Sequence, residues 1–192
     1  MAYYSEKKLK KLGIGKLGVN VKISEKVSIY FPEMISIGDN VRIDDYVCLS
    51  GEIIIGNNVH IANLCTLTAS NNVISMGDFS GLAFGVHIFA SSDDYSGLSM
   101  TNPTVSADFK NVKMSNVTLG RHVTVGANSV IFPGSIIEEG CAIGSLSLVN
   151  SNLTSWGIYA GIPAKRIKER SMKIIELEKL LHKKLTINSP LH

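Results

Sequence analysis

The chain has 192 residues, of which 45% are hydrophobic and 18% are charged, a length and composition typical of one globular domain with a packed core. Its formal net charge of +3 is too small to indicate a nucleic-acid-binding protein. The sequence contains no stretch of about 18 consecutive apolar residues, so it predicts no membrane span, and its first residues lack the apolar segment of a secretory signal. We therefore expect a cytoplasmic protein.

Residues 1–16 form a charged N-terminal segment that lacks the periodic pattern of the following chain. We expect a short helix or arm here that caps the first turn of the fold. The end of a repeat structure otherwise exposes apolar side chains and unpaired strand edges.

A six-residue repeat of aliphatic side chains dominates the sequence up to Val149. A helix repeats about every 3.6 residues and a strand about every two, so neither gives this spacing. The repeat predicts a solenoid in which three hexads make one coil and stacked coils bury a continuous core. The repeating positions are Ile37, Ile43, Leu49, Ile55, Ile61, Leu67, Met76, Leu82, Ile88, Leu119, Val125, Ile131, Ile137, Ile143 and Val149.

A small or β-branched residue follows four positions after most of these aliphatic residues, where a coil narrows. Cys65 and Cys141 occupy such positions, and together with Cys48 they show no metal-ligand spacing. We expect Cys65 and Cys141 to be inert core thiols in a reducing compartment.

The repeat is interrupted at three places. A looser early set of aliphatic residues is out of phase with Ile37, which predicts a small insertion near residues 32–35, and a second slip lies between Leu67 and Met76. The long break at residues 89–117 has no repeat, and a long loop on a rigid frame is often functional.

After Val149 the repeat ends, and residues 164–185 mix isoleucine and leucine with lysine and glutamate. This pattern predicts an amphipathic C-terminal helix. The predicted organisation is an N-terminal cap at 1–16, a solenoid with an inserted loop at 17–163, and a C-terminal helix and tail at 164–192.

Four segments resemble the hexapeptide-repeat acyltransferases, and the resemblance covers nearly the whole chain. They are Phe-Ala-Ser-Ser-Asp-Asp-Tyr-Ser-Gly at 89–97, Thr-Asn-Pro-Thr at 101–104, Val-Gly-Ala-Asn-Ser-Val-Ile at 125–131 and Tyr-Ala-Gly-Ile-Pro-Ala-Lys at 159–165. The loop is similar to that of the maltose and galactoside O-acetyltransferase branch, and closer still to enzymes that N-acylate nucleotide-linked amino sugars. The resemblance implies an all-β solenoid in the form of a left-handed parallel β-helix. It also implies acyl-CoA as co-substrate and a homotrimer with clefts between the subunits.

One departure from the O-acetyltransferases concerns the acceptor. They carry a His-Pro in this loop as general base, whereas the matching region here offers Asp93 and Asp94. A hydroxyl needs strong base assistance to become a nucleophile, but a neutral amine needs only a carboxylate or water to take its proton. This favours N-acylation. The alternative for the two acids is turn formation.

His87 ends its hexad beside the loop and is the alternative base, for O-acylation of a sugar hydroxyl. His60 and His122 lie on the coils and are weaker candidates. No group of residues has metal-ligand spacing, so we expect no metal.

The coenzyme residues follow from the resemblance, in which pantetheine lies in a groove between subunits along the C-terminal coils. Carried over, this implicates small residues that allow close approach of a ligand, and two cations that could meet phosphates. Backbone N–H groups near Gly85 or Gly126 are candidates for stabilising the thioester oxyanion. The implied coenzyme residues are Gly126, Ala127, Ser145, Ala160, Gly161, Lys165 and Arg166.

The sequence therefore predicts an acyl-CoA-dependent acyltransferase that adds an acetyl or larger acyl group to the amine of a nucleotide-linked amino-deoxysugar for a surface glycan. Two alternatives stay open: a sugar O-acetyltransferase that uses His87, and a non-catalytic solenoid scaffold.

Overall fold

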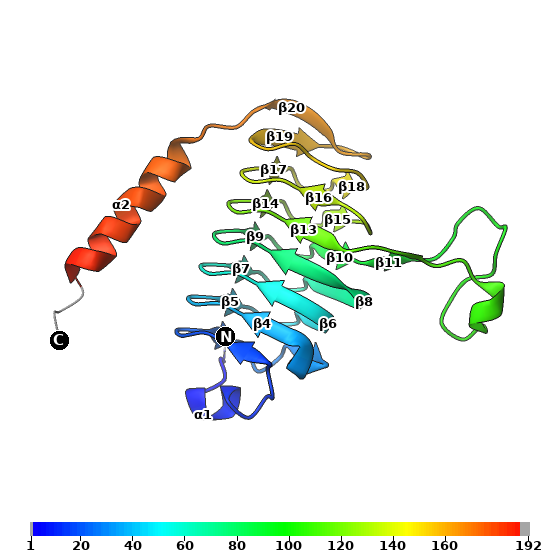
Figure 1. Ribbon diagram of the computed structural model, residues 1–192, viewed down its shortest axis with the longest axis horizontal. Coiled ribbons are helices and arrows are strands. Elements are labelled where there is room, and N and C mark those ends of the chain that lie inside the picture. Colours follow the sequence, from blue (N-terminus) through cyan, green and yellow to red (C-terminus); the bar gives the residue numbers. More distant parts are fainter. Residues whose placement is uncertain (1, 189–192) are drawn as a thin grey trace.

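Short strands stack into a parallel β-solenoid in the computed structural model, which describes residues 2–188 (Figure 1). The strands form three rows that run the length of the solenoid. The first row contains β1 (Lys16–Leu17), β4 (Ile35–Ile37), the ends of β6 (Cys48–Ile55) and β8 (Thr66–Met76), β13 (Val117–Leu119) and β16 (Ile136–Ile137). The second contains β2 (Lys22–Ile23), β5 (Arg42–Ile43), β7 (His60–Ile61), β9 (Gly81–Leu82), β14 (Thr124–Val125), β17 (Ala142–Ile143) and β19 (Gly157–Ala160). The third contains β3 (Ser28–Tyr30), the starts of β6 and β8, β10 (His87–Phe89), β15 (Val130–Ile131) and β18 (Leu148–Val149).

The aliphatic repeat faces the interior of this solenoid, as predicted. Ile37, Ile55 and Met76 pair in register on successive coils, and each is at most 2% exposed. Cys65 and Cys141 are also buried, and burial raises the pKa of the Cys65 thiol to about 11. That thiol therefore stays protonated near neutral pH, which suits an inert core residue.

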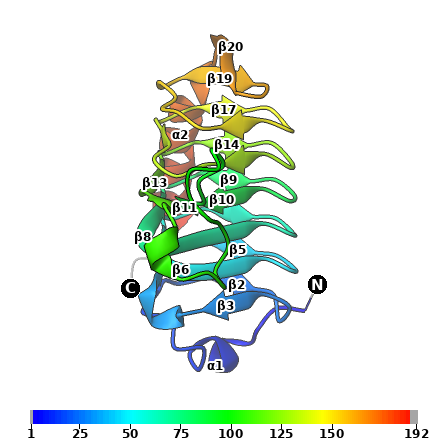
Figure 2. The ribbon, with the colours of Figure 1, turned by 90° about the vertical axis from the view of Figure 1, so that its right-hand side faces the viewer.

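All three interruptions of the repeat fall at the corner between the third and first rows, which we call the insertion corner. The first forms the 3-10 helix η1 (Pro32–Met34), and the second is a register shift within β8 near Ser70. The third is a long arm that leaves the solenoid after β10 and returns at β13, and it projects away from the coils (Figures 1 and 2).

The N-terminal end of the solenoid is covered by α1 (Glu6–Leu9), whose Leu9 is buried against the core. The division of the chain at residues 16/17 and 163/164 stays a prediction.

The C-terminal segment differs from the single helix predicted over residues 164–185. β20 (Lys165–Glu169) turns back antiparallel on β19, and α2 (Lys173–Asn188) begins only after it. β20 pairs with the last parallel strand and so covers its open edge. The apolar periodicity of the sequence cannot predict β20, because this strand forms in response to the unpaired backbone edge of the last coil.

The helix α2 lies beside the corner between the first and second rows, which we call the helix corner (Figure 2). His122 Nε2 lies 2.8 Å from Glu178 Oε2, and the rings of Phe79 and His122 stack with centroids 5.1 Å apart. Burial alone would raise the pKa of Glu178, but the hydrogen bond with His122 and the charge of Arg121 outweigh it and lower that pKa. Within residues 2–188, no helix has the length and apolar character needed to cross a membrane.

Candidate active site

The arm begins on a short antiparallel stem beside the third row. β11 (Ser91–Ser92) pairs with β12 (Lys113–Met114), and the arm also contains the 3-10 helix η2 (Ala107–Phe109). Ser91 Oγ lies 2.7 Å from Ser70 Oγ on the neighbouring coil, and the Ser115 N–H donates to the Ala90 carbonyl. The base of the arm is therefore fixed to the solenoid.

Asp94 holds the arm in shape. Its carboxylate accepts hydrogen bonds from the Ser96 N–H at 2.9 Å, the Ser96 hydroxyl at 2.8 Å and the Ser99 hydroxyl at 3.1 Å. The bonds from the Ser96 backbone and hydroxyl lower the pKa of Asp94. This is the turn chemistry that the sequence left open as the alternative.

Asp93 is placed differently, although it is adjacent in the chain. Its carboxylate accepts one hydrogen bond within residues 2–188, from the Asn102 N–H at 3.1 Å, and it lines two open pockets. The arm pocket, of about 410 Å³, is lined by Phe89, Ser91, Ser92, Asp93, Tyr95, Asn102, Pro103, Lys110, Val112 and Phe132. The coil pocket, of about 460 Å³, is lined by Ser92, Asp93, Asp94, Tyr95, Ser96, Lys113, Phe132, Pro133 and Asn150.

The two pockets share a wall formed by Ser92, Asp93, Tyr95 and Phe132. One lysine is among the other lining residues of each pocket, Lys110 in the arm pocket and Lys113 in the coil pocket. A carboxylate on a shared wall can take a proton from a group in either pocket. Such a pair of pockets suits a reaction between two substrates.

His87 lies on β10 and lines neither pocket. Its half-buried ring stacks parallel to that of Phe89, with centroids 6.1 Å apart, and Phe89 lines the arm pocket. The ring of Phe89 therefore separates His87 from the arm pocket.

The two coil histidines are engaged elsewhere. His60 Nε2 lies 2.8 Å from the buried carboxylate of Asp44, which also accepts from Arg42 Nε at 2.7 Å. His122 is bound to Glu178 of α2. Neither lines the two pockets beside Asp93.

Three of the predicted coenzyme residues, Gly126, Ala127 and Ser145, lie at the corner between the second and third rows. A Cβ at Gly126 would come within 2.4 Å of the Ser145 backbone nitrogen. Close stacking of two coils is therefore enough to require a glycine here, and the role of Gly126 at the coenzyme stays a prediction.

The two candidate oxyanion donors are also engaged within the coils. The Gly126 N–H donates to the Ile143 carbonyl at 2.8 Å, and the Gly85 N–H donates to the Asn63 carbonyl at 3.0 Å. In this structure the N–H groups of these two glycines hold the coils together.

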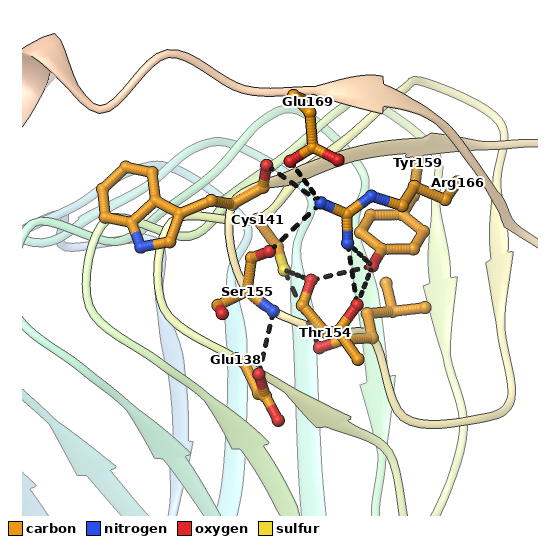
Figure 3. Close-up of polar contacts among 9 residues, drawn as sticks. Glu138, Cys141, Thr154, Ser155, Tyr159, Arg166 and Glu169 are labelled. Carbon is orange, nitrogen blue, oxygen red and sulfur yellow. Dashed lines mark hydrogen bonds and ion pairs between the residues drawn. The ribbon is translucent and has the colours of Figure 1, made fainter.

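Arg166 lies on β20 and fastens this strand to the last coil (Figure 3). Its guanidinium donates to Glu169 Oε2 at 2.6 Å and to Thr154 Oγ1 at 2.8 Å, and lies 5.8 Å from the Tyr159 ring centroid. The hydrogen bond to Glu169 raises the pKa of Arg166. These contacts favour a structural role, and the role of Arg166 at a coenzyme phosphate stays a prediction.

Lys165 differs from its neighbour because its exposed side chain makes no polar contact within residues 2–188. It pairs through its backbone with Ala160, across the turn that contains Gly161 at φ +104°. An exposed ammonium group next to this turn is available to a phosphate.

The structure brings Asp93 and Asp94 to one site, while Lys165, Arg166, Ala160 and Gly161 gather at the end of the solenoid. Sequence reasoning missed Lys110, Lys113 and Phe132. The available signal was charge, because Lys110 and Lys113 are the two lysines within residues 89–117. Among residues 2–188, no cluster of His, Cys, Asp or Glu has the geometry to hold a metal ion.

Comparisons with known proteins agree with this architecture. A family model described as Bacterial transferase hexapeptide (six repeats) matches residues 34–69. A dTDP-4-amino-4,6-dideoxy-D-glucose acyltransferase from Escherichia coli is 41% identical over 181 residues, which cover 93% of this chain and 94% of the relative. Galactoside O-acetyltransferase from Escherichia coli K12 is 25% identical over 151 residues, covering 77% and 70% of the two chains.

A solved structure is similar over nearly its full length. It is AntD, an N-acyltransferase from Bacillus cereus, in complex with dTDP and 3-hydroxybutyryl-CoA. The TM-score is 0.95 at 44% identity, and the match covers 97% of this chain and 100% of AntD.

Proposed function

This chain belongs to the hexapeptide-repeat transferase family, and we propose that it transfers an acyl group from acyl-CoA to the amine of a dTDP-linked amino-deoxysugar. The predicted membership is thereby confirmed, with N-acyltransferases of nucleotide-linked amino sugars among its similar relatives. Acetyl-CoA and longer acyl-CoA donors such as 3-hydroxybutyryl-CoA are both candidates.

The observation that carries the choice of acceptor is the position of Asp93 on the wall shared by two pockets, neither of which is lined by a histidine. The neutral amine attacks the thioester carbonyl carbon, a C–N bond forms, and the CoA thiolate leaves. The amine proton passes to the Asp93 carboxylate and then to solvent. An amine is nucleophilic enough for a carboxylate base, whereas a hydroxyl needs a stronger one.

We propose that each of the two pockets binds a different substrate. We assign the sugar nucleotide to the arm pocket, where Tyr95 and Phe89 offer aromatic surface to the base and Lys110 offers charge to the diphosphate. We assign the acyl thioester to the coil pocket, because Pro133 and Asn150 belong to the same C-terminal coils as Ser145. In this arrangement Asp93 lies where the amine meets the thioester.

The coenzyme then extends toward the end of the solenoid, past Gly126, Ala127, Ser145, Ala160, Gly161 and Lys165. We infer a homotrimer in which a neighbouring copy forms the other wall of this groove. A cytoplasmic location agrees with the three free cysteines and with the supply of acyl-CoA.

A thiol-release assay tests the acceptor directly. Acetyl-CoA and 3-hydroxybutyryl-CoA would be offered with dTDP-4-amino-4,6-dideoxyglucose, and with the matched sugar that has a hydroxyl in place of the amine. We expect thiol release with the amine alone. Release with the hydroxyl sugar would overturn the proposal and favour O-acylation, for which His87, whose ring stacks on Phe89 of the arm pocket, is the candidate base.

Two lysines provide a matched test of the substrate division. Lys110→Ala should raise KM for the sugar nucleotide and leave KM for acyl-CoA unchanged, while Lys113→Ala should do the reverse. The reciprocal result would exchange the two assignments, and unchanged KM values in an active enzyme would refute the division while leaving the reaction itself in place.

A further inference from the structure

The corner between the second and third rows contains a column of equivalent positions, most of which bury a small side chain. They are equivalent because each carbonyl accepts from the first N–H of a third-row strand on the preceding coil, as Ser147 accepts from Val130 and Gly161 from Leu148. In chain order the column contains Val47, Cys65, Val86, Ser129, Ser147 and Gly161. Its hydroxyl groups therefore occur on the two coils immediately before Gly161.

The two serines of this column are buried and fully engaged in hydrogen bonds. The hydroxyl of Ser147, which is 3% exposed, donates to the Gly144 carbonyl at 2.7 Å and accepts from the Gly161 N–H at 3.2 Å. The hydroxyl of Ser129 donates to the same Gly144 carbonyl at 3.0 Å and accepts from the Ser147 N–H at 3.2 Å. A side chain of one coil thus holds the backbone of the next, from Ser129 to Ser147 and from Ser147 to Gly161.

The last step of this series reaches the turn at residues 160–164, which we call the Gly161 turn. The Leu148 N–H donates to the Gly161 carbonyl at 3.0 Å, and the Ala164 N–H donates to the Leu148 carbonyl at 2.8 Å. These are backbone bonds to β18. Within residues 2–188, the side-chain hydrogen bond to this turn comes from Ser147. Gly161 itself is exposed, so the turn is held from inside and open to a ligand from outside.

We propose that Ser147 is a positioning residue for the coenzyme, an inference that rests on the proposed function. Ala160, Gly161 and Lys165 are the proposed coenzyme residues at this turn, and Lys165 pairs with Ala160 through the backbone. Ser147 is too deeply buried to contact the coenzyme and acts through Gly161. A backbone that is already fixed in its binding conformation does not have to be ordered when the ligand binds, which improves affinity.

Loss of the Ser147 hydroxyl should leave the fold in place and release the turn. In Ser147→Ala the Gly161 N–H loses its partner, and the exposed turn can move outward and donate to water instead. Only the fraction of molecules that keeps the original turn then binds the coenzyme well, so the apparent affinity falls by that fraction. The chemistry at Asp93 lies on the arm and depends on none of these contacts.

Calorimetric titration of the full chain with CoA, together with steady-state kinetics, tests this role. In Ser147→Ala we expect the Kd for CoA and the KM for acetyl-CoA to rise about fivefold to tenfold. The kcat at saturating acetyl-CoA and the KM for the sugar nucleotide should change less than about twofold. Ser147→Thr keeps a hydroxyl and should restore the affinity, because the column accepts β-branched side chains at Val47 and Val86.

The matched control is Ser135→Ala. Ser135 is fully buried on a different corner, where its hydroxyl donates to the Val149 carbonyl at 3.4 Å and does not contact the Gly161 turn. This variant should bind CoA like the wild type, whatever its effect on Tm. The inference is overturned if Ser147→Ala binds CoA normally, if Ser135→Ala weakens binding as much, or if Ser147→Thr binds as weakly as Ser147→Ala.

The same titration separates this inference from the proposed function. A wild type that does not bind CoA would refute both. Equal CoA binding by the wild type and Ser147→Ala would refute the role of Ser147 alone and leave the acyl transfer in place.

Discussion

The coils of this protein are stabilised by buried apolar side chains, whereas its arm is stabilised by polar contacts. Every coil places aliphatic side chains such as Ile43 and Ile61 in one continuous core, where they are fully buried. In the arm, residues 91–116 include no buried residue, and its shape depends on polar contacts such as those of Asp94 and Asn102. The coils can therefore supply rigidity, and the arm is free to present polar groups to substrates.

The largest effect should come from a charge placed inside the coils. Ile137 is fully buried, whereas its neighbour Ile136 is 47% exposed on the outer face of the same strand. Ile137→Asp buries an unpaired carboxylate and should cost more than about 4 kcal/mol of unfolding free energy. Ile136→Asp should cost less than about 1 kcal/mol. Chemical denaturation of both variants measures the difference, and equal costs would refute the register of the core.

The next effect concerns the arm and leaves the fold intact. Asp93→Asn removes the proposed proton acceptor, so kcat should fall at least about 100-fold with a stability change within about 0.5 kcal/mol. Asp94→Asn is the matched variant. It alters the contacts to Ser96 and Ser99 and should lower kcat less than about tenfold.

Steady-state kinetics with both variants separates the two acids. If Asp94→Asn loses activity while Asp93→Asn retains it, the roles assigned to the two carboxylates are reversed. If both remain fully active, the base lies outside this pair.

A third effect compares a buried acid of the coils with an exposed acid of the arm. Burial alone would raise the pKa of Asp44, but hydrogen bonds from Arg42, His60 and Tyr3 outweigh it and lower that pKa below 3.8. The charged form therefore stabilises the fold above pH 3.8, and this contribution is lost as the pH falls through the folded-state pKa. Asp44→Asn should cost about 2 kcal/mol at pH 7.

Denaturation at several pH values checks the sign. The difference between the wild type and Asp44→Asn should shrink as the pH is lowered below 3.8. Asp108→Asn, in the exposed η2 of the arm, should stay within about 0.5 kcal/mol of the wild type. A gap that persists unchanged at low pH would show that the effect of Asp44→Asn does not come from charge.

The solenoid could be predicted from the sequence because every coil requires the same kind of side chain at the same position. Ile37, Ile55 and Ile61 all fill the interior of a coil, so their spacing revealed the solenoid and its interruptions. The arm has no such repetition, and the contrast between Asp93 and Asp94 depends on hydrogen bonds to Asn102 and Ser99 that no spacing encodes.

The prediction of a single C-terminal helix was wrong for a related reason. The strand β20 forms because β19 has an open edge, a property of the assembled coil. The apolar and charged residues of this segment are equally compatible with a helix, and the helical pattern in fact applies only from Lys173 onward.

The smallest effect separates two adjacent cations at that end of the solenoid. Lys165 is exposed and has no polar partner in the described part of the chain, whereas Arg166 binds Glu169 and Thr154. Lys165→Ala should raise KM for acyl-CoA by about threefold to tenfold without changing Tm, because it removes a phosphate contact and no structural one. Arg166→Ala should lower Tm by about 3 °C with little change in KM, because it releases β20 from the last coil. If Arg166→Ala raises KM at unchanged Tm, its guanidinium leaves Glu169 for the coenzyme, and the end of the solenoid belongs to the site as much as the arm does.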